Sequence, residues 1–142
     1  MKKPEGNLTP VQYQIMEAIW SRGEEGASVV EIWRAVRADR SVGRTTVLNL
    51  VDRLEKRGWL VCCRENRPNR YTAAVSRQDT SALLAGEFVN DFFSGSAGNL
   101  VMSLLGSKRL SRAEIEQVSK LLEEASTKAT PSKASKKQEG RP

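Results

Sequence analysis

The chain has 142 residues, of which 39% are hydrophobic and 28% charged, and its net charge is +6. This length and composition indicate one folded domain, or one with a small appendage, rather than a disordered chain. No apolar run approaches the ~20 residues that cross a bilayer, and the first ten residues lack the apolar segment of a signal peptide, so we expect a cytoplasmic protein without a membrane partner.

The positive charge is unevenly distributed along the chain. Residues 1–75 hold 13 Lys and Arg against 9 Asp and Glu, residues 76–126 hold 5 against 7, and residues 127–142 hold 5 against 1. The first part and the C-terminal end are therefore basic, while the segment between them is slightly acidic. A basic first part favours a polyanionic partner such as nucleic acid.

The residue types on which most catalytic and metal sites depend are scarce. The chain contains no His, which removes the commonest general base and the commonest metal ligand. Its carboxylates are spaced as on solvated helix faces, and no glycine-rich phosphate loop follows a strand. We therefore expect neither an enzyme nor a metal site or cofactor.

The only two cysteines, Cys62 and Cys63, are adjacent. Neighbouring cysteines cannot supply the Cys-x2-Cys geometry of a zinc site. On a strand they point to opposite faces, so we expect one to be a small buried residue and the other a half-exposed thiol. A sensor of redox state or of thiophilic metals is the alternative interpretation.

Two short helices with N-terminal caps are predicted in the first 40 residues. Thr9-Pro10-Val11-Gln12 and Ser28-Val29-Val30-Glu31 are both capping boxes, and Gly23 to Gly26 separates the two helices. Apolar residues repeat along one face of each helix, as expected where a helix packs on a core. These residues are Val11, Ile15, Ala18 and Ile19 in the first helix and Val29, Ile32 and Val36 in the second.

A third helix, rich in Arg and Thr, is predicted after Ser41. Val47, Leu50, Val51 and Leu54 follow the spacing i, i+3, i+4 and i+7, so they share one stripe that faces a core. The opposite face carries short hydrogen-bonding and basic side chains, which suit base edges and phosphates. This face consists of Thr45, Asn49, Asp52 and Lys56, with Thr46 and Arg53 beside it.

Two short strands joined by a basic turn follow the third helix and end near Val75. Two capped helices, a basic helix and a hairpin occur in this order in a winged helix-turn-helix. We therefore predict a mainly α fold with a small β-hairpin, in which residues 1–75 form a winged helix-turn-helix DNA-binding domain. A charged helix face that is merely solvated is the alternative for the third helix taken by itself.

Three further helices are predicted in residues 76–126. The first is capped by Ser76 and runs to about Phe93, and Ser94-Gly95-Ser96 interrupts it. The second runs from Asn99 to about Leu105, and Gly106 stops it. The last begins at the capping box Ser111-Arg112-Ala113-Glu114.

About 50 residues are too few for an independent core, yet this segment carries many large apolar side chains. We expect it to be a helical dimerisation segment that buries them against a second copy of the chain. Folding back onto the first domain is the alternative. The residues expected in the interface are Leu84, Phe88, Phe92, Leu104, Val118 and Leu121.

The C-terminal end, STKATPSKASKKQEGRP from Ser126, contains no aromatic or branched aliphatic residue. Such a composition cannot bury enough apolar surface to fold. We expect residues 127–142 to be a disordered basic tail, which either adds non-specific attraction to DNA or keeps the chain soluble.

Residues spread over about 8–125 carry a family resemblance through their order and spacing. They are Leu8-Thr9, Ile15-Met16 and Ile19-Trp20 in the first helix; Thr46-Val47, Leu50, Arg53-Leu54 and Lys56-Arg57-Gly58 in the third; Tyr71-Thr72 and Val75-Ser76-Arg77 after the turn; and Leu110-Ser111, Glu114-Ile115 and Leu121-Leu122 in the last. With these residues the chain resembles the penicillinase-repressor family (BlaI/MecI type), which comprises bacterial winged-helix repressors of antibiotic-resistance and related operons.

The resemblance implies a homodimer that binds a palindromic operator in double-stranded DNA, with C-terminal helices that dimerise. The implied DNA contacts are of two kinds: base edges approached by Thr45, Thr46 and Asn49, and phosphates met by Arg44, Arg53 and the wing residues Arg67 and Arg70.

The resemblance also implies release by proteolysis. In relatives of this kind a membrane-bound sensor protease leads to cleavage at an Asn-Phe bond in a helix after the wing domain. The corresponding pair here is Ser103-Leu104, which departs from that pattern. Copper-responsive relatives carry Cys-x-Cys pairs near the C-terminus, and this tail has no cysteine.

The sequence thus predicts a DNA-binding repressor that is released by proteolysis or by another signal. The alternative is a winged-helix protein-interaction module that does not bind DNA. The repressor is favoured if four arginines share one surface: Arg44, Arg53, Arg67 and Arg70. An apolar patch on that surface favours the interaction module.

Overall fold

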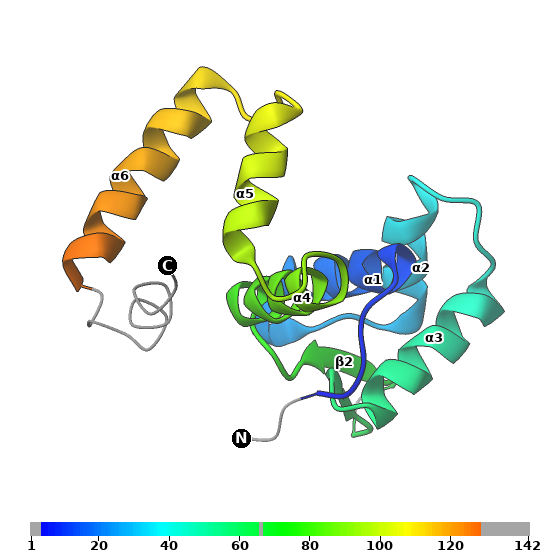
Figure 1. The fold of residues 1–142 in the computed structure, drawn as a ribbon. Helices are drawn as coiled ribbons and strands as arrows, with labels where there is room; N and C mark the ends of the chain where they lie inside the picture. The colour runs from blue at the N-terminus through cyan, green and yellow to red at the C-terminus, as the bar shows by residue number, and fades with distance from the viewer. Residues whose placement is uncertain (1–3, 66, 129–142) are drawn as a thin grey trace. The chain divides into compact units, whose positions relative to one another are not determined.

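The computed structural model describes residues 4–65 and 67–128, and the chain divides into two compact units between Gly95 and Ser96. None of the described helices is long and apolar enough to cross a membrane. The first unit contains, in chain order, α1 (Pro10–Trp20), the 3-10 turn η1 (Gly23–Glu25), α2 (Val29–Arg37), α3 (Arg44–Lys56), β1 (Leu60–Cys63), β2 (Arg70–Ala73) and α4 (Arg77–Phe92). Figure 1 shows these elements as a mainly helical fold with a small hairpin, as the sequence predicts.

The predicted capping boxes begin α1 and α2. The Thr9 hydroxyl accepts a hydrogen bond from the Gln12 N–H at 3.3 Å, and the Gln12 amide oxygen accepts one from the Thr9 N–H at 2.9 Å. Ser28 and Glu31 make the same two bonds at 3.3 and 3.0 Å. Each box satisfies two backbone N–H donors at a helix end, so both helices begin at the predicted residues.

The core of the first unit lies where the apolar faces of α1, α2 and α3 meet beneath the hairpin. On α3, Val47, Val51 and Leu54 are fully buried and Leu50 is half-buried, as their spacing predicts. Each fully buried side chain of this size contributes about 1.5–3 kcal/mol. The other large buried side chains of the core are Ile15, Met16, Ile19, Ile32, Val36, Trp59, Leu60 and Tyr71.

The two strands are antiparallel, and Cys62 is paired with Tyr71 across them. A single bridge adds Ala27 to the outer edge of β2, with hydrogen bonds of 3.0 and 2.8 Å between the Ala27 and Tyr71 backbones. The residue before it must be a glycine: Gly26 has φ +72°, and a Cβ there would lie 2.4 Å from the Tyr71 carbonyl oxygen. The hairpin is thereby attached to the start of α2.

The two cysteines lie on the hairpin, as predicted. Cys62 is half-buried against the core rather than fully buried, and Cys63 is exposed. Burial, followed by its hydrogen bond with Cys62, raises the pKa of Tyr71 to about 12. The side chain of Tyr71 therefore stays neutral and serves as part of the core.

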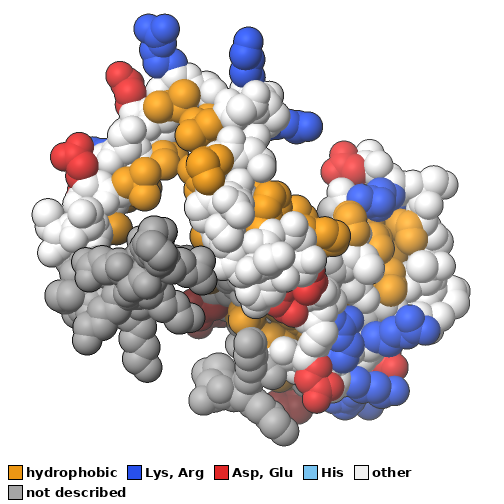
Figure 2. Space-filling view, in the orientation of Figure 1, with side chains coloured by type: hydrophobic (Ala, Val, Ile, Leu, Met, Phe, Trp, Pro, Cys, Tyr) orange, Lys and Arg blue, Asp and Glu red, His pale blue; other side chains and the backbone are white. Residues whose placement is uncertain are grey.

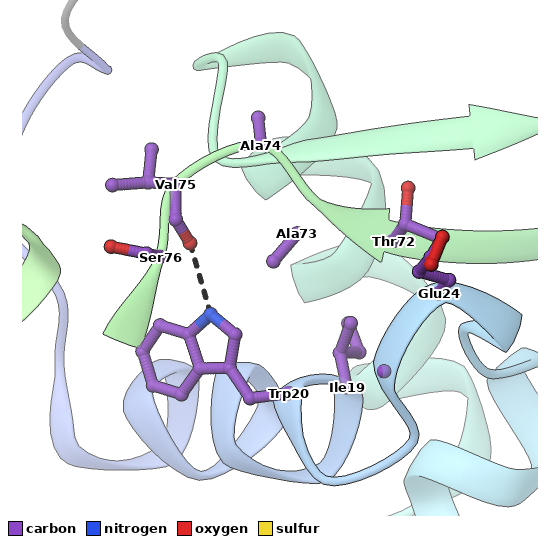
Figure 3. A pocket seen from close by; sticks show the side chains of 9 residues that line it. Ile19, Trp20, Glu24, Thr72, Ala73, Ala74, Val75 and Ser76 are labelled. Atoms are coloured by element: carbon purple, nitrogen blue, oxygen red, sulfur yellow. Dashed lines mark hydrogen bonds between the residues drawn. The ribbon is translucent and has the colours of Figure 1, made fainter. Parts of the chain in front are cut away.

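α4 belongs to the first unit, although the sequence predicts a domain boundary before it at residue 75. The Trp20 indole N–H donates to the Val75 carbonyl oxygen at 2.9 Å, across a hollow of about 540 Å³ between α1 and the end of β2 (Figure 3). Arg77 pairs with Glu17 and lies over the Trp20 ring. Leu83 packs against the core, so the compact unit extends through α4.

The second unit consists of α5 (Ala97–Gly106) and α6 (Arg112–Lys128). α5 begins two residues earlier than expected because Ser96 caps it through the Asn99 N–H at 3.1 Å. Gly106 is its last helical residue rather than its stop. The predicted box at Ser111 and Glu114 is present, with bonds of 2.9 and 3.1 Å.

The last helix also ends later than expected. Residues 126–128, whose composition predicts the start of a disordered tail, form the final turn of α6, and the Thr127 hydroxyl donates to the Glu124 carbonyl oxygen at 2.9 Å. A terminal helical turn needs no buried face, which explains why the polar composition does not end the helix there. The remainder of the predicted tail, residues 129–142, lies outside the described residues.

Candidate nucleic-acid interface

The N-terminus of α3 differs from those of the other α-helices. Its N-cap is Gly43, which supplies no side-chain hydrogen bond, whereas Ser or Thr side chains cap α1, α2, α4, α5 and α6. The backbone N–H groups of the first turn of α3 therefore have no side-chain acceptor. Free N–H groups and the positive end of the helix dipole together favour an anion at this position.

The face of α3 opposite the core presents the residues predicted to approach bases. Thr45, Thr46 and Asn49 are exposed along this face. Asp52 and Lys56 also lie there, but they pair with each other at 3.0 Å. The short polar side chains are therefore concentrated in the first two turns of the helix.

Sequence reasoning missed one residue on this face. Leu48 lies between Thr45 and Asn49 in the sequence and is 47% exposed. An apolar side chain beside hydrogen-bonding ones can contact the methyl group of thymine. The signal that could have found it is the helical period, since Leu48 falls outside the stripe of Val47, Val51 and Leu54.

The arginines of the first unit differ in whether they have partners within the fold. Six of them donate hydrogen bonds or pair with acidic groups within the unit: Arg22, Arg40, Arg57, Arg64, Arg70 and Arg77. In the part of the chain that the structure describes, the side chains of four others on α2 and α3 form neither a hydrogen bond nor an ion pair: Arg34, Arg37, Arg44 and Arg53. Two of these four, Arg44 and Arg53, are among the predicted phosphate contacts.

Arg70, also a predicted phosphate contact, makes contacts within the fold. Its guanidinium donates to the carbonyl oxygens of Glu25 at 3.0 Å and Gly26 at 2.8 Å, and to the Glu31 carboxylate at 3.1 Å. The side chain is only 23% exposed. Arg70 therefore ties β2 to the start of α2, because the bridge at Ala27 brings that region beside the strand.

The Arg70 contact also affects the carboxylate that it meets. The hydrogen bond from the Ser28 N–H is the largest cause that lowers the pKa of Glu31, and the charges of Arg22 and Arg70 lower it further. The ionised carboxylate of Glu31 thus contacts both the N-terminal cap of α2 and, through Arg70, the hairpin.

The other predicted phosphate contacts remain on the surface. Arg53 lies on α3, and Arg67 lies in the turn of the hairpin, and both side chains are exposed. Figure 2 shows Lys and Arg side chains gathered at the lower right, in the region of α3 and the hairpin. The structure therefore places Arg44 and Arg53 on α3 and Arg67 in the exposed turn of the hairpin. The guanidinium of Arg70, in contrast, is bound within the fold.

The residues predicted to dimerise are distributed over three helices. On α4, Phe88 is 46% and Phe92 is 71% exposed, and their rings lie 5.0 Å apart. On α6, Leu121 is 57% exposed. The others, which are half-buried, are Leu84 on α4, Leu104 on α5 and Val118 on α6.

The pair considered as a cleavage region, Ser103 and Leu104, lies inside α5. Its backbone is therefore helical. The non-helical segment between α4 and α5 contains Ser94, with φ +50°, and Gly95, with φ +82°. A non-helical segment suits a protease better than a helix does, so this connection is the more accessible place.

Comparisons with known proteins agree with the resemblance seen in the sequence. The family model described as penicillinase repressor matches residues 8–124. The methicillin resistance regulatory protein MecI of Mammaliicoccus sciuri is 24% identical over 115 residues, which cover 81% of this chain and 92% of that protein. The penicillinase repressor of Bacillus licheniformis is 24% identical over 117 residues, which cover 82% and 90%.

A third relative matches a shorter part of the chain at higher identity. The transcriptional regulator BlaI of Mycobacterium tuberculosis is 30% identical over 83 residues, which cover 58% of this chain and 57% of that protein. Because the family model spans nearly all of the described residues, the chain belongs to the penicillinase repressor family of DNA-binding transcriptional repressors.

Proposed function

We propose that this chain is a sequence-specific repressor that binds an inverted-repeat operator as a homodimer through α3 and the hairpin. The observation that carries the proposal is the surface of α3, where exposed Thr45 and Asn49 lie beside arginines whose side chains have no hydrogen bond or ion pair among the described residues. An arginine whose guanidinium makes no hydrogen bond or ion pair within the fold keeps its donors and its charge for phosphate.

The side chains on α3 have separate roles in this proposal. Thr45, Thr46 and Asn49 meet base edges, and Leu48 meets a thymine methyl group. Contacts to phosphate come from Arg44, Arg53 and Arg67, which set the position of the helix in the major groove without reading sequence. Arg70 acts indirectly, since it holds the hairpin against α2.

The homodimer is supported by apolar side chains that this chain leaves uncovered. Phe88 and Phe92 on α4 and Leu121 on α6 are each at least 46% exposed. Two copies related by a two-fold axis would bury such faces and would present two α3 helices to half-sites about 34–36 Å apart or a multiple of that distance.

Release by proteolysis is supported by the non-helical connection between α4 and α5, which contains Ser94 and Gly95. A cut there separates the unit that contains α3 from α5 and α6 and their exposed apolar side chains. The two DNA-binding units then lose their linkage, which can reduce operator affinity by ~100-fold or more. An engineered protease site at this connection tests the proposal, and unchanged operator affinity after cleavage would show that these helices do not join the two copies.

The interaction module without DNA binding has less support. Near α3 the exposed large apolar residues are Leu48 and Val61, and they stand among polar and basic side chains. The larger apolar group, which includes Phe88 and Phe92, lies on α4. The surface of α3 therefore lacks the apolar patch that this alternative needs.

Binding measurements on operator and random DNA test the proposed function. The operator is first selected from genomic fragments with the purified protein. Asn49→Ala should weaken operator binding by about 1–3 kcal/mol and leave binding to random DNA nearly unchanged. Arg53→Ala should weaken both and reduce the dependence on salt.

Arg22→Ala is the matched control, because it removes the same charge from a side chain that pairs with Glu31 at 3.4 Å. Its affinity for both DNAs should stay close to that of the wild type. Equal losses on operator and random DNA for Asn49→Ala would contradict the assignment of base contacts to α3.

A further inference from the structure

We propose that Trp33 is a positioning residue that holds Arg37 and Arg44 for contact with the DNA backbone at the turn between α2 and α3. This inference rests on the proposed DNA-binding function and adds to it a phosphate-binding element, here called the Trp33 clamp, which consists of Trp33, Arg37 and Arg44. Arg37 is not part of the α3 surface described above.

Trp33 connects α2 to the turn that leads into α3. Its indole N–H donates to the Val42 carbonyl oxygen at 2.9 Å. The ring is half-buried and packs against the core beside α2. This hydrogen bond and the packing against the core therefore fix the ring just before the first residue of α3.

The exposed part of the ring holds two arginines. The guanidinium carbon of Arg37 lies 4.5 Å from the centroid of the Trp33 ring, and that of Arg44 lies 5.1 Å from it. An indole attracts cations to its face, and this attraction offsets the repulsion between two like charges. The ring thus concentrates two positive charges, one from the end of α2 and one from the start of α3.

No acidic group within the described residues neutralises these charges. Neither guanidinium forms an ion pair there, and Asp39, the acidic residue of the turn, pairs with neither. The other arginine of the turn, Arg40, donates instead to the Gln14 amide on α1. The cluster therefore keeps its net positive charge, and a polyanion is the complementary partner.

The contacts with the ring leave the hydrogen-bonding groups of both arginines available. A cation–π contact uses none of the five N–H donors of a guanidinium, whose planar fork matches two phosphate oxygens. Arg37 also lines an open hollow of about 530 Å³ along the turn, whose lining includes Trp33 and Arg40 as well as the acidic residue Asp39. Space for an approaching phosphate therefore exists beside it.

The position of the clamp gives it a specific role. Arg44 is the first residue of α3, whose N-terminus has no side-chain cap. A phosphate held there fixes the depth and direction of α3 in the groove, on which the base contacts depend. Because Trp33 restricts both arginines before binding, less side-chain entropy is lost when the phosphate is bound.

The test uses the full-length protein with its selected operator and with random DNA, measured as a function of salt. Arg37→Ala should weaken binding to both DNAs about tenfold and reduce the slope of log affinity against log salt by about 0.9 for each phosphate that the variant no longer neutralises. Trp33→Leu should produce a similar fall in affinity, and Trp33→Phe, which keeps an aromatic face, should restore most of it. Arg22→Ala serves as the control for charge.

A double-mutant comparison separates positioning from a merely structural role. If Trp33 acts through the two arginines, Trp33→Leu should weaken DNA binding much less when Arg37 and Arg44 are already Ala. An equal loss in both backgrounds, or an Arg37→Ala protein whose salt slope equals that of the wild type, would overturn the clamp while the proposed function stands. A wild-type protein without affinity for any DNA would overturn both.

Discussion

The two units of this chain differ in how far their helices bury apolar side chains. In the first unit, side chains from α1, α2, α3 and the hairpin form one core, and residues such as Ile32 and Leu54 are fully buried. Among residues 96–127, none is buried. The exposed large apolar side chains of this second unit are Val101, Met102, Leu105, Ile115, Leu121 and Leu122.

The comparison shows that local signals and burial are separate requirements. α5 and α6 have Ser caps as good as those of the first unit, at 3.1 Å in both helices. Caps begin a helix, but a short helix in water is marginal without a packed apolar face. The first unit therefore carries its own stability, whereas we infer that the second depends on a second copy of the chain.

The largest predicted effect tests the stability of the first unit and comes from a substitution in its core. Leu54→Ala removes a fully buried side chain and should lower the free energy of unfolding by about 2–5 kcal/mol. Denaturant unfolding followed by Trp fluorescence measures it, because all three Trp, at positions 20, 33 and 59, lie in the first unit. Leu122→Ala, on the exposed surface of α6, should leave this transition within about 0.5 kcal/mol of the wild type.

The next effect concerns the second unit and should appear in assembly rather than in the folding of the first. Leu121→Asp places a charge on the apolar side of α6 and should convert the proposed dimer into a monomer, with a fall in operator affinity of ~100-fold. Sedimentation and DNA binding measure the two changes, and Glu124→Asp on the same helix is the control. A wild-type protein that sediments as a monomer at micromolar concentration would refute the expected dependence on a second copy.

The smallest effect concerns the junction between α2 and the hairpin. Because the pKa of Glu31 is lowered in the folded protein, its carboxylate stabilises the fold above the ordinary value of 4.5, and this stabilisation is lost as the pH falls through the lowered pKa. Glu31→Gln should therefore lower Tm slightly at pH 7. The difference from the wild type should shrink as the pH falls below 4.5.

Thermal unfolding followed by Trp fluorescence measures this difference, and Glu24→Gln in the neighbouring turn is the matched control. A deficit for Glu31→Gln that is as large at pH 3 as at pH 7 would show that the carboxylate charge contributes nothing.

Much of the candidate interface could be predicted from the sequence because its signals are local. The capping boxes at Thr9 and Ser28 and the stripe from Val47 to Leu54 depend on residues within one or two helical turns. Those signals are enough to place Thr45 and Asn49 on an exposed face. They cannot predict which arginines find partners within the fold, because those partners are distant in the sequence.

Arg70 and Arg37 illustrate that limit in two different ways. Arg70 follows a basic turn and is predicted from the sequence to meet phosphate, but the bridge between Ala27 and Tyr71 places it against backbone carbonyls 44 and 45 residues away. Arg37 stands among ordinary surface charges in the sequence, and only the approach of α3 to α2 brings it and Arg44 to the same indole ring.

The sequence by itself determined the order of the helices, the starting residues of the helices that begin at capping boxes, and the apolar faces that α1, α2 and α3 bury, since each of these depends on spacing along one helix. The tertiary structure decided which unit α4 joins, through Trp20, Arg77 and Leu83, and which arginines remain available to DNA. The reason is physical: caps and periodicity act over a few residues, whereas burial and charge pairing depend on which segments the folded core brings together.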